Sequence, residues 1–143
     1  MTPTRLALLA ALTAVTVAAL IGCGGSDDPS GPARLALATD IPGAWDLDVF
    51  FASGDTTLAE YFGDPEATEV DAIFRVDRTF TMTLRDTNGS RLSEITGTWE
   101  LPTPGELTIT YPDGPVTYTA RYIQEWLYIR TSLNGEDIRL YFN

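Results

Sequence analysis

The chain has 143 residues, with twenty Asp and Glu against nine Arg, no Lys and no His, and a formal net charge of −11. Nucleic-acid binding rests on clustered basic side chains, so this charge argues against nucleic acid as a partner. Without imidazole, Ser-His-Asp and Cys-His catalysis and zinc sites that need His are excluded. The length is typical of one domain.

The first 22 residues have the composition of an export signal. A single charge, Arg5, precedes an apolar run over residues 6–21. This run is shorter than the ~20 residues that a transmembrane helix needs, and it matches the apolar region of a secretory signal. We therefore expect residues 1–22 to be a signal peptide.

The signal ends in Leu20-Ile21-Gly22-Cys23, which resembles a bacterial lipobox. The resemblance implies that Cys23 carries a diacylglyceryl group, becomes the first residue of the mature chain and anchors the protein to a membrane. Since Cys23 is the only cysteine, it has no internal disulfide partner, and lipidation explains its presence. The alternative is a small apolar residue in an ordinary signal peptide.

The residue after Cys23 is Gly24 and not Asp. In Gram-negative lipoproteins an Asp there is the commoner signal for inner-membrane retention, so the resemblance favours the outer membrane of the cell envelope. Residues 23–33 consist of Gly, Ser, Asp, Pro and Ala besides Cys23, and they are expected to form a flexible tether. Loss of residues 1–22 removes one Arg and no acid, which leaves a net charge of −12.

Residues 34–143 are expected to form the folded domain, because all fifteen aromatic residues lie within them. Apolar residues there recur with a period of two, which predicts half-buried strands. The connections carry turn residues such as Asn88-Gly89 and Asn134-Gly135. The predicted strands span residues 44–52, 70–76, 79–86, 91–101, 106–111, 116–123, 125–133 and 137–142.

Short connections make neighbouring strands pair antiparallel. The predicted fold class is therefore all-β, an eight-stranded antiparallel up-and-down meander that closes into a barrel, with a β-sandwich as the alternative. Residues 53–69 interrupt the rhythm and predict a longer loop with one helical turn across one mouth of the barrel. Tyr61 and Phe62 would act there as a packed plug or, alternatively, as a mobile ligand gate.

Several segments resemble bacterial lipoproteins that carry a lipocalin-like domain: Gly43-Ala44-Trp45, the hairpin from Phe74 to Phe80, and Gly97-Thr98-Trp99-Glu100-Leu101. Leu107-Thr108-Ile109-Thr110 and Trp126-Leu127-Tyr128-Ile129 continue the resemblance. The resemblance covers nearly all of residues 43–142 and implies a lipocalin-like barrel. The hairpin departs from it, with Asp77-Arg78-Thr79 where Asp-Gly-Thr is commoner.

An eight-stranded barrel is either filled by side chains or holds one small ligand. Gly97 would leave room among bulky neighbours, whereas the alternative is that all inward residues form a packed core. A cavity lined by aromatic residues and Tyr hydroxyls suits a hydrophobic small molecule. The candidate lining residues are Trp45, Phe74, Phe80, Met82, Gly97, Trp99, Tyr118 and Tyr122, and Leu47, Val49 and Ile109 are also expected to face inward.

Phe50, Trp126 and Tyr128 are expected on outward faces, where they could dock a protein partner. The acidic clusters match no calcium-loop spacing and are typical of solvated surfaces, so we predict no metal site, no cofactor and no catalytic residue. The sequence therefore favours a non-enzymatic, lipid-anchored envelope protein that binds a hydrophobic ligand. The alternative is a protein-interaction or structural accessory module that uses an outer face of the barrel.

Overall fold

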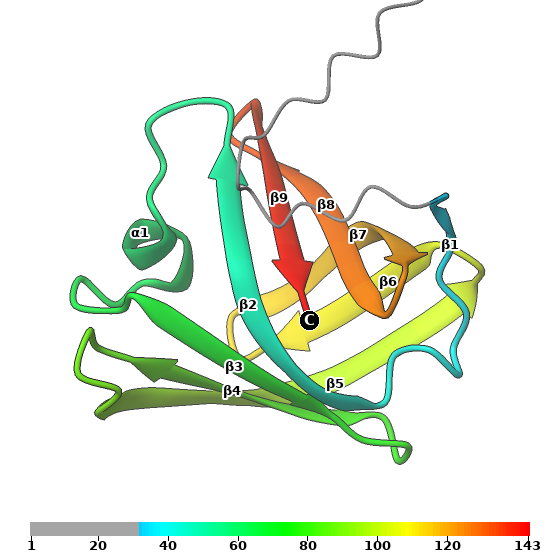
Figure 1. Ribbon diagram of the computed structural model, residues 1–143, viewed down its shortest axis with the longest axis horizontal. Coiled ribbons are helices and arrows are strands. Elements are labelled where there is room, and N and C mark those ends of the chain that lie inside the picture. Colours follow the sequence, from blue (N-terminus) through cyan, green and yellow to red (C-terminus); the bar gives the residue numbers. More distant parts are fainter. Residues whose placement is uncertain (1–31) are drawn as a thin grey trace, which may run out of the picture.

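Eight strands form a meander in which each pairs antiparallel with the next along the chain, and the last of them pairs with the first. The computed structural model describes residues 32–143, which form the predicted closed eight-stranded up-and-down β-barrel (Figure 1). Closure is between β2 and β9, where Leu47 lies opposite Phe142 and Ala52 opposite Ile138. This pairing rules out the β-sandwich. The strands are β2 (Gly43–Ala52), β3 (Glu69–Phe74), β4 (Thr79–Arg85), β5 (Arg91–Thr103), β6 (Glu106–Tyr111), β7 (Gly114–Ile123), β8 (Trp126–Leu133) and β9 (Glu136–Phe142).

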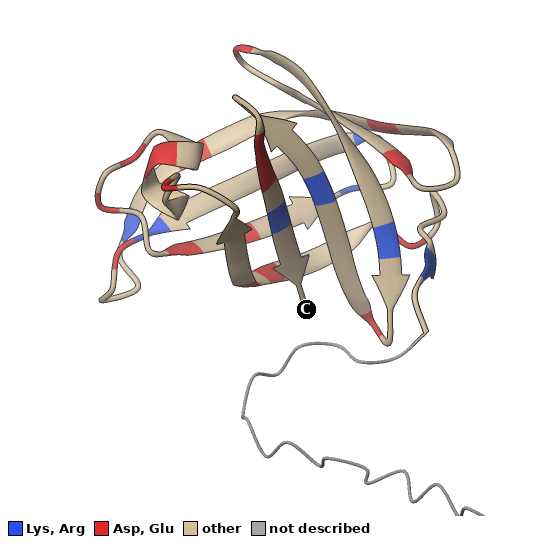
Figure 2. Cartoon of the chain, turned by 90° about the horizontal axis from the view of Figure 1, so that it is seen from above, with Lys and Arg blue, Asp and Glu red and all other residues tan. Residues whose placement is uncertain are grey.

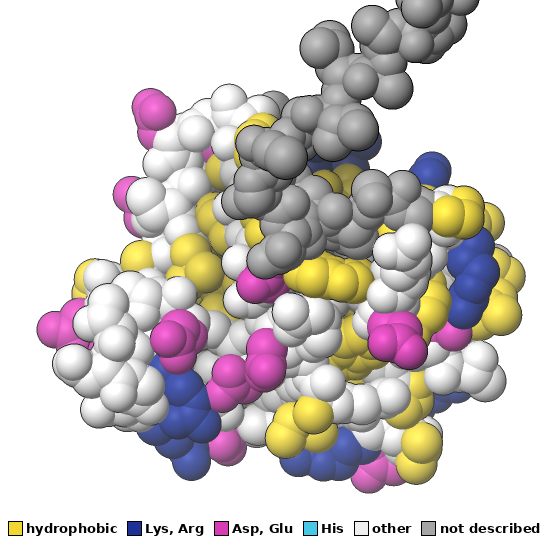
Figure 3. All heavy atoms as spheres, in the orientation of Figure 1, with side chains coloured by type: hydrophobic (Ala, Val, Ile, Leu, Met, Phe, Trp, Pro, Cys, Tyr) yellow, Lys and Arg dark blue, Asp and Glu magenta, His cyan; other side chains and the backbone are white. Residues whose placement is uncertain are grey.

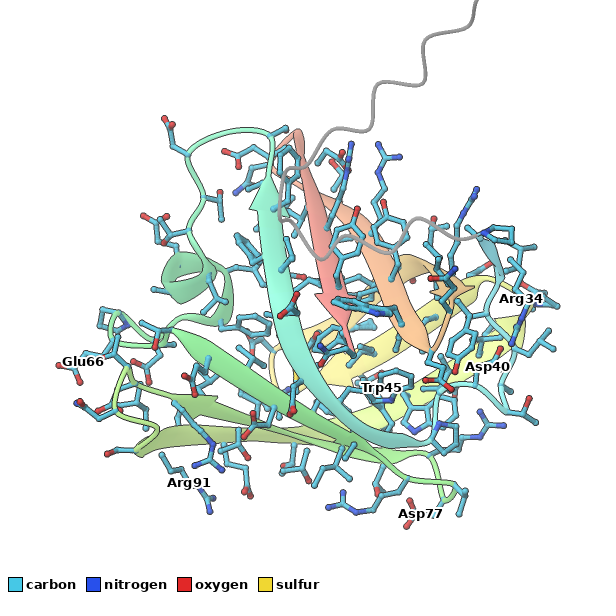
Figure 4. The ribbon with its side chains drawn as sticks, in the orientation of Figure 1. Arg34, Asp40, Trp45, Glu66, Asp77 and Arg91 are labelled. Atoms are coloured by element: carbon cyan, nitrogen blue, oxygen red, sulfur yellow. The ribbon has the colours of Figure 1, made fainter. Side chains whose placement is uncertain are left out.

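A further short strand, β1 (Arg34–Leu35), pairs with the outer part of β7 and is absent from the sequence prediction. It leads into a segment in which Ala36 and Ile41 are fully buried. Arg34 and Asp40 clasp this segment through two hydrogen bonds of 2.6 and 2.7 Å and lie side by side in Figure 4. The guanidinium of Arg34 lowers the pKa of Asp40.

The interior holds the apolar side chains of alternate strand positions, and no polar or charged residue is buried among the described residues 32–143. In β4, for example, Phe80, Met82 and Leu84 are buried while the Thr residues between them are partly exposed. This alternation is what a barrel with one dry and one wet face requires.

Strand β2 departs from simple alternation. Its register with β9 shifts between Leu47 and Val49, so that Asp48 is an extra residue in a β-bulge. After the bulge, Phe50 lies opposite buried Leu140 and packs against the core. The predicted orientations of Val49 and Phe50 are therefore wrong, because a pattern of period two does not register an inserted residue.

The ladder between β7 and β8 covers only part of both strands. It runs from Ile123 opposite Trp126 to Thr119 opposite Arg130. Beyond that point residues 114–118 of β7 and 131–133 of β8, here called the β7–β8 seam, are not paired with each other, and the Thr131 hydroxyl donates to the Thr117 carbonyl at 3.1 Å. The barrel wall thus lacks ladder bonds beside this end of β7.

Pro115 lies in the part of β7 that has no pairing partner in β8, where a proline is tolerated. The Ala120 N–H donates to the Gly105 carbonyl on the β6 side, so odd-numbered residues of β7 direct their backbone groups toward β8. Pro115 has no N–H to offer in that direction, and at the unpaired seam no ladder bond is lost. Strands β5 and β7 accordingly extend past their predicted ends to include Pro102 and Pro115.

Candidate ligand-binding site

A pocket of about 590 Å³, here called the mouth pocket, opens at the end of the barrel that carries α1 (Leu58–Phe62). Its walls come from α1, β5, the β6–β7 turn and both sides of the β7–β8 seam. The lining residues are Tyr61, Phe62, Ile95, residues 111–116 and residues 131–133.

The helical turn at the mouth is fixed at both ends. Thr57 and Glu60 form a capping box, in which the Thr57 hydroxyl accepts from the Glu60 N–H and the Glu60 carboxylate accepts from the Thr57 N–H. Gly63 ends the helix with φ of 75°, a left-handed conformation that glycine adopts without strain. The predicted loop with one helical turn is therefore present.

The aromatic residues of α1 pack onto the barrel. The Tyr61 ring lies 5.6 Å from that of Phe50 and 5.0 Å from that of Phe62, and both α1 residues contact the core. The bulge in β2 turns the Phe50 ring inward, and Tyr61 packs against that ring.

Three tyrosine hydroxyls meet beside the mouth pocket, and we call them the tyrosine trio. The Tyr118 hydroxyl lies 2.7 Å from that of Tyr61 and 2.8 Å from that of Tyr111. Burial raises the pKa of all three phenols, which keeps them protonated and able to donate hydrogen bonds. Tyr61 and Tyr111 line the pocket, and Tyr118 stands behind them with 1% of its surface exposed.

The eight candidate lining residues predicted from the sequence lie elsewhere. None of them lines the mouth pocket, but two touch its wall: Tyr118 through the tyrosine trio, and Phe80 through the ring of Tyr111, whose centroid is 5.5 Å away. Phe74 packs on Phe80 and on Trp99, with ring centroids 5.9 and 6.2 Å apart. Met82 is buried in the same cluster of core residues.

Trp45 and Tyr122 meet edge to face toward the end of the barrel away from α1, with ring centroids 6.4 Å apart. The Trp45 indole N–H donates to the Ile41 carbonyl at 2.9 Å, which ties the segment after β1 to the core. Figure 4 shows Trp45 among the side chains inside the barrel.

Gly97 does not border an empty space. A Cβ atom there would lie 2.0 Å from the Thr110 carbonyl oxygen and 2.7 Å from the Phe80 ring. The glycine is required by the close approach of the β6 backbone, and the Phe80 ring covers it.

A second hollow, of about 1140 Å³, follows the outer face of β7 and β8 and reaches β9. Tyr128 lines it and stacks with Tyr141 at 4.7 Å, so its outward orientation is confirmed. Asp137 bridges Arg130 and Arg139, and these arginines lower its pKa. Figure 2 shows arginines on neighbouring strands of this face. The hollow is an open, charged groove and not a cavity of the barrel.

The acidic clusters of residues 32–143 form no metal site. Asp46 and Asp48 are exposed, as their alternation with Trp45 predicts. Within residues 32–143, no three Cys, Asp or Glu side chains come together in a way that would hold a metal ion. In the same part of the chain no helix is long and apolar enough to cross a membrane.

No protein-family model matches the chain, and no curated protein matches it in sequence. The lipobox residues Leu20, Ile21 and Gly22 and the predicted lipidation site Cys23 lie outside the described residues.

Proposed function

We propose that this protein is a lipid-anchored lipoprotein of the cell envelope whose barrel binds a small hydrophobic molecule in the mouth pocket and catalyses no reaction. The mouth pocket carries the proposal. Its volume of about 590 Å³ falls in the range of small-molecule sites, ~300–1,000 Å³. It opens beside Tyr61 and Phe62, within the loop that the sequence places across a barrel mouth.

The lining supports an apolar guest. Phe62, Ile95, Val116 and Leu133 present hydrophobic surface to the pocket, and the tyrosine trio adds a small number of polar groups at one place. A mostly apolar wall with a few polar groups that fix orientation is the usual composition of a small-molecule site.

A competitive fluorescent probe tests this role better than the intrinsic fluorescence of the protein. Trp45, Trp99 and Trp126 all lie toward the end of the barrel away from α1, so they would report poorly on the mouth. We expect N-phenyl-1-naphthylamine to brighten on binding to purified mature domain and long-chain alcohols to displace it.

A matched pair of variants locates the binding. Leu133→Trp places a bulky ring at the pocket wall, at a position 39% exposed where the fold tolerates it. Val76→Trp adds the same ring at a turn position 82% exposed and far from the mouth. Probe binding should fall at least about tenfold in the first variant and stay unchanged in the second. Equal binding by both variants, or no binding by the unmodified domain, would contradict the proposal.

The anchor has its own test. Cells fed radioactive palmitate should label the protein, and mass spectrometry should find Cys23 modified as the first residue of the mature chain. One acyl chain gives reversible membrane binding, whereas two or more hold a protein stably. A Cys23→Ser variant serves as the control and should be unlabelled. An unmodified Cys23 in the mature protein would overturn the lipoprotein assignment.

A protein-interaction module is the second candidate. Tyr128 and Tyr141 stack on the outer face of β8 and β9, above the open groove. The exposed large hydrophobic residues do not extend this pair into one patch, because they are scattered over β1, β2, β3, β8 and the loops: Leu35, Leu37, Phe51, Ile73, Val76 and Leu133. In Figure 3 charged side chains interrupt the hydrophobic ones across the visible face. The mouth pocket is therefore favoured.

A further inference from the structure

The tyrosine trio has one hydroxyl proton more than it uses. Each phenol carries one O–H donor, and the three groups share two hydrogen bonds, Tyr61 to Tyr118 and Tyr118 to Tyr111. Tyr118 can donate to only one neighbour. Whichever direction the two bonds run, one proton of the trio is left without an acceptor inside the trio.

The spare proton belongs beside the mouth pocket. If Tyr118 donates to Tyr111, the Tyr111 proton is the spare one, and if Tyr118 donates to Tyr61, it is the Tyr61 proton. Both of these residues line the pocket. The third arrangement, in which Tyr118 accepts from both neighbours, leaves the buried Tyr118 proton without an acceptor and is disfavoured by the cost of an unpaired buried donor. Hydroxyl rotation interconverts the arrangements without moving a ring. The trio is thus a hydrogen-bond donor that adapts to where an acceptor sits.

The charge around the pocket is negative. Among the described residues that line it, none is basic and Asp113 is acidic. Five of the described arginines form ion pairs, and none of these pairs lines the pocket: Arg34, Arg85, Arg91, Arg130 and Arg139. A carboxylate that entered would lose its hydration with no cation to replace it, in the field of a chain of net charge −11.

We propose that the ligand of the mouth pocket is an uncharged amphipathic molecule, with a hydroxyl or carbonyl oxygen that accepts the spare proton of the tyrosine trio and an apolar chain held by Phe62, Ile95, Val116 and Leu133. This inference rests on the proposed function and narrows it. Free fatty acids in their ionised form are excluded as the preferred class, and alcohols, esters and acylglycerols are included.

Ligands of one chain length and different head groups separate the possibilities. Decanol, methyl decanoate and decanoate are titrated against the mature domain loaded with N-phenyl-1-naphthylamine at neutral pH. We expect decanol and methyl decanoate to bind at least about tenfold more tightly than decanoate. As the pH is lowered through the pKa of the free fatty acid, decanoate should tighten toward decanol while decanol itself stays constant.

Removing the three hydroxyls assigns the preference to the trio. The variant Tyr61→Phe/Tyr111→Phe/Tyr118→Phe keeps the ring shapes and leaves no phenol without a partner, so the barrel should still fold. Its affinity for decanol should fall about three- to tenfold, which is the value of one hydrogen bond. The control, Tyr128→Phe/Tyr141→Phe, removes two hydroxyls from the outer face and should bind as the unmodified domain does.

The outcomes distinguish this inference from the function on which it rests. If none of the three ligands displaces the probe, the proposed function fails. If decanoate binds as tightly as decanol at neutral pH, the barrel is a binding protein and the uncharged class is wrong. If the triple variant keeps full affinity for decanol, the tyrosine trio does not donate a hydrogen bond to the ligand oxygen. The ligand series and its pH dependence use the unmodified domain, so they decide whether the preferred ligand is uncharged even if the triple variant does not fold.

Discussion

The guanidinium of Arg78 lies 4.3 Å above the ring of Trp99, and the Arg78 carbonyl accepts a hydrogen bond from the backbone N–H of Trp99 at 2.8 Å. Arg78 has φ of 72°, in the left-handed region where glycine is favoured. The structure therefore explains the arginine in the Asp77-Arg78-Thr79 turn. Its side chain covers the Trp99 indole and so shields that ring from water at this end of the barrel.

Substitutions at Arg78 separate the backbone strain from the contact. Arg78→Gly relieves the strain and loses the cation–π contact, whereas Arg78→Ala keeps the strain and loses the contact. We expect Arg78→Ala to be less stable than Arg78→Gly by about 1 kcal/mol in urea unfolding. Equal midpoints for the two variants would contradict a left-handed residue at this position.

Gly97→Ala should destabilise the barrel by about 2–3 kcal/mol, because the new methyl group meets the Thr110 carbonyl and the β5–β6 pair must move apart. Urea denaturation of the variant measures the loss. Thr96→Ala and Thr98→Ala alter exposed neighbours on the same strand and should stay within ~0.5 kcal/mol of the unmodified chain. A stable Gly97→Ala variant would mean that room exists beside the glycine.

The clasp between Arg34 and Asp40 should make stability depend on acid. Arg34 lowers the pKa of Asp40 in the folded chain, so the clasp stabilises the fold above the unfolded pKa of about 3.9 and is lost as the pH falls through the folded value. Asp40→Asn should therefore lower the melting temperature at neutral pH, and its effect should shrink as the pH falls below the unfolded pKa and through the lowered folded pKa. A constant difference across this range would show that the charge of Asp40 is unimportant.

The tyrosine trio should be non-additive in stability. Tyr118→Phe removes the central hydroxyl and leaves two part-buried phenols without their partner, at a cost of about 1–3 kcal/mol. The triple phenylalanine variant leaves no such group and should be more stable than Tyr118→Phe alone. Urea midpoints of the two variants decide the order, and a triple variant that loses more than the single one would contradict the hydrogen-bonded trio.

Much of the fold follows from the sequence because the interior of a barrel imposes a strict period of two. Strand β6 has the predicted bounds, and most other strand ends lie within about two residues of prediction. Asn88-Gly89 and Asn134-Gly135 form the expected turns, with positive φ at Gly89, Asn134 and Gly135. The sequence pattern does not predict the bulge in β2 or the short strand β1, because neither changes the kinds of residue found in its segment.

The site was harder to predict than the fold. Tyr111 and Tyr118 could be placed on the inner face from the alternation of β6 and β7, since both strands carry apolar residues at every second position. Nothing in the sequence places the Tyr61 hydroxyl against them, because that contact depends on how a five-residue helix returns over the mouth. The candidate residues chosen for their size instead fill the barrel, since large apolar side chains serve packing first.

The β7–β8 seam bears on how a guest would enter. Residues 114–116 and 131–133 form one wall of the mouth pocket, and there the backbone ladder is missing. Two strand ends can spread from the last pair, Thr119 and Arg130, without breaking any ladder bond between them, so entry from the side does not require α1 to lift. The Thr117 amide, which faces this gap, should accordingly exchange with deuterium faster than those of Thr119 and Arg121, which face β8 within the ladder, and a bound guest should slow it.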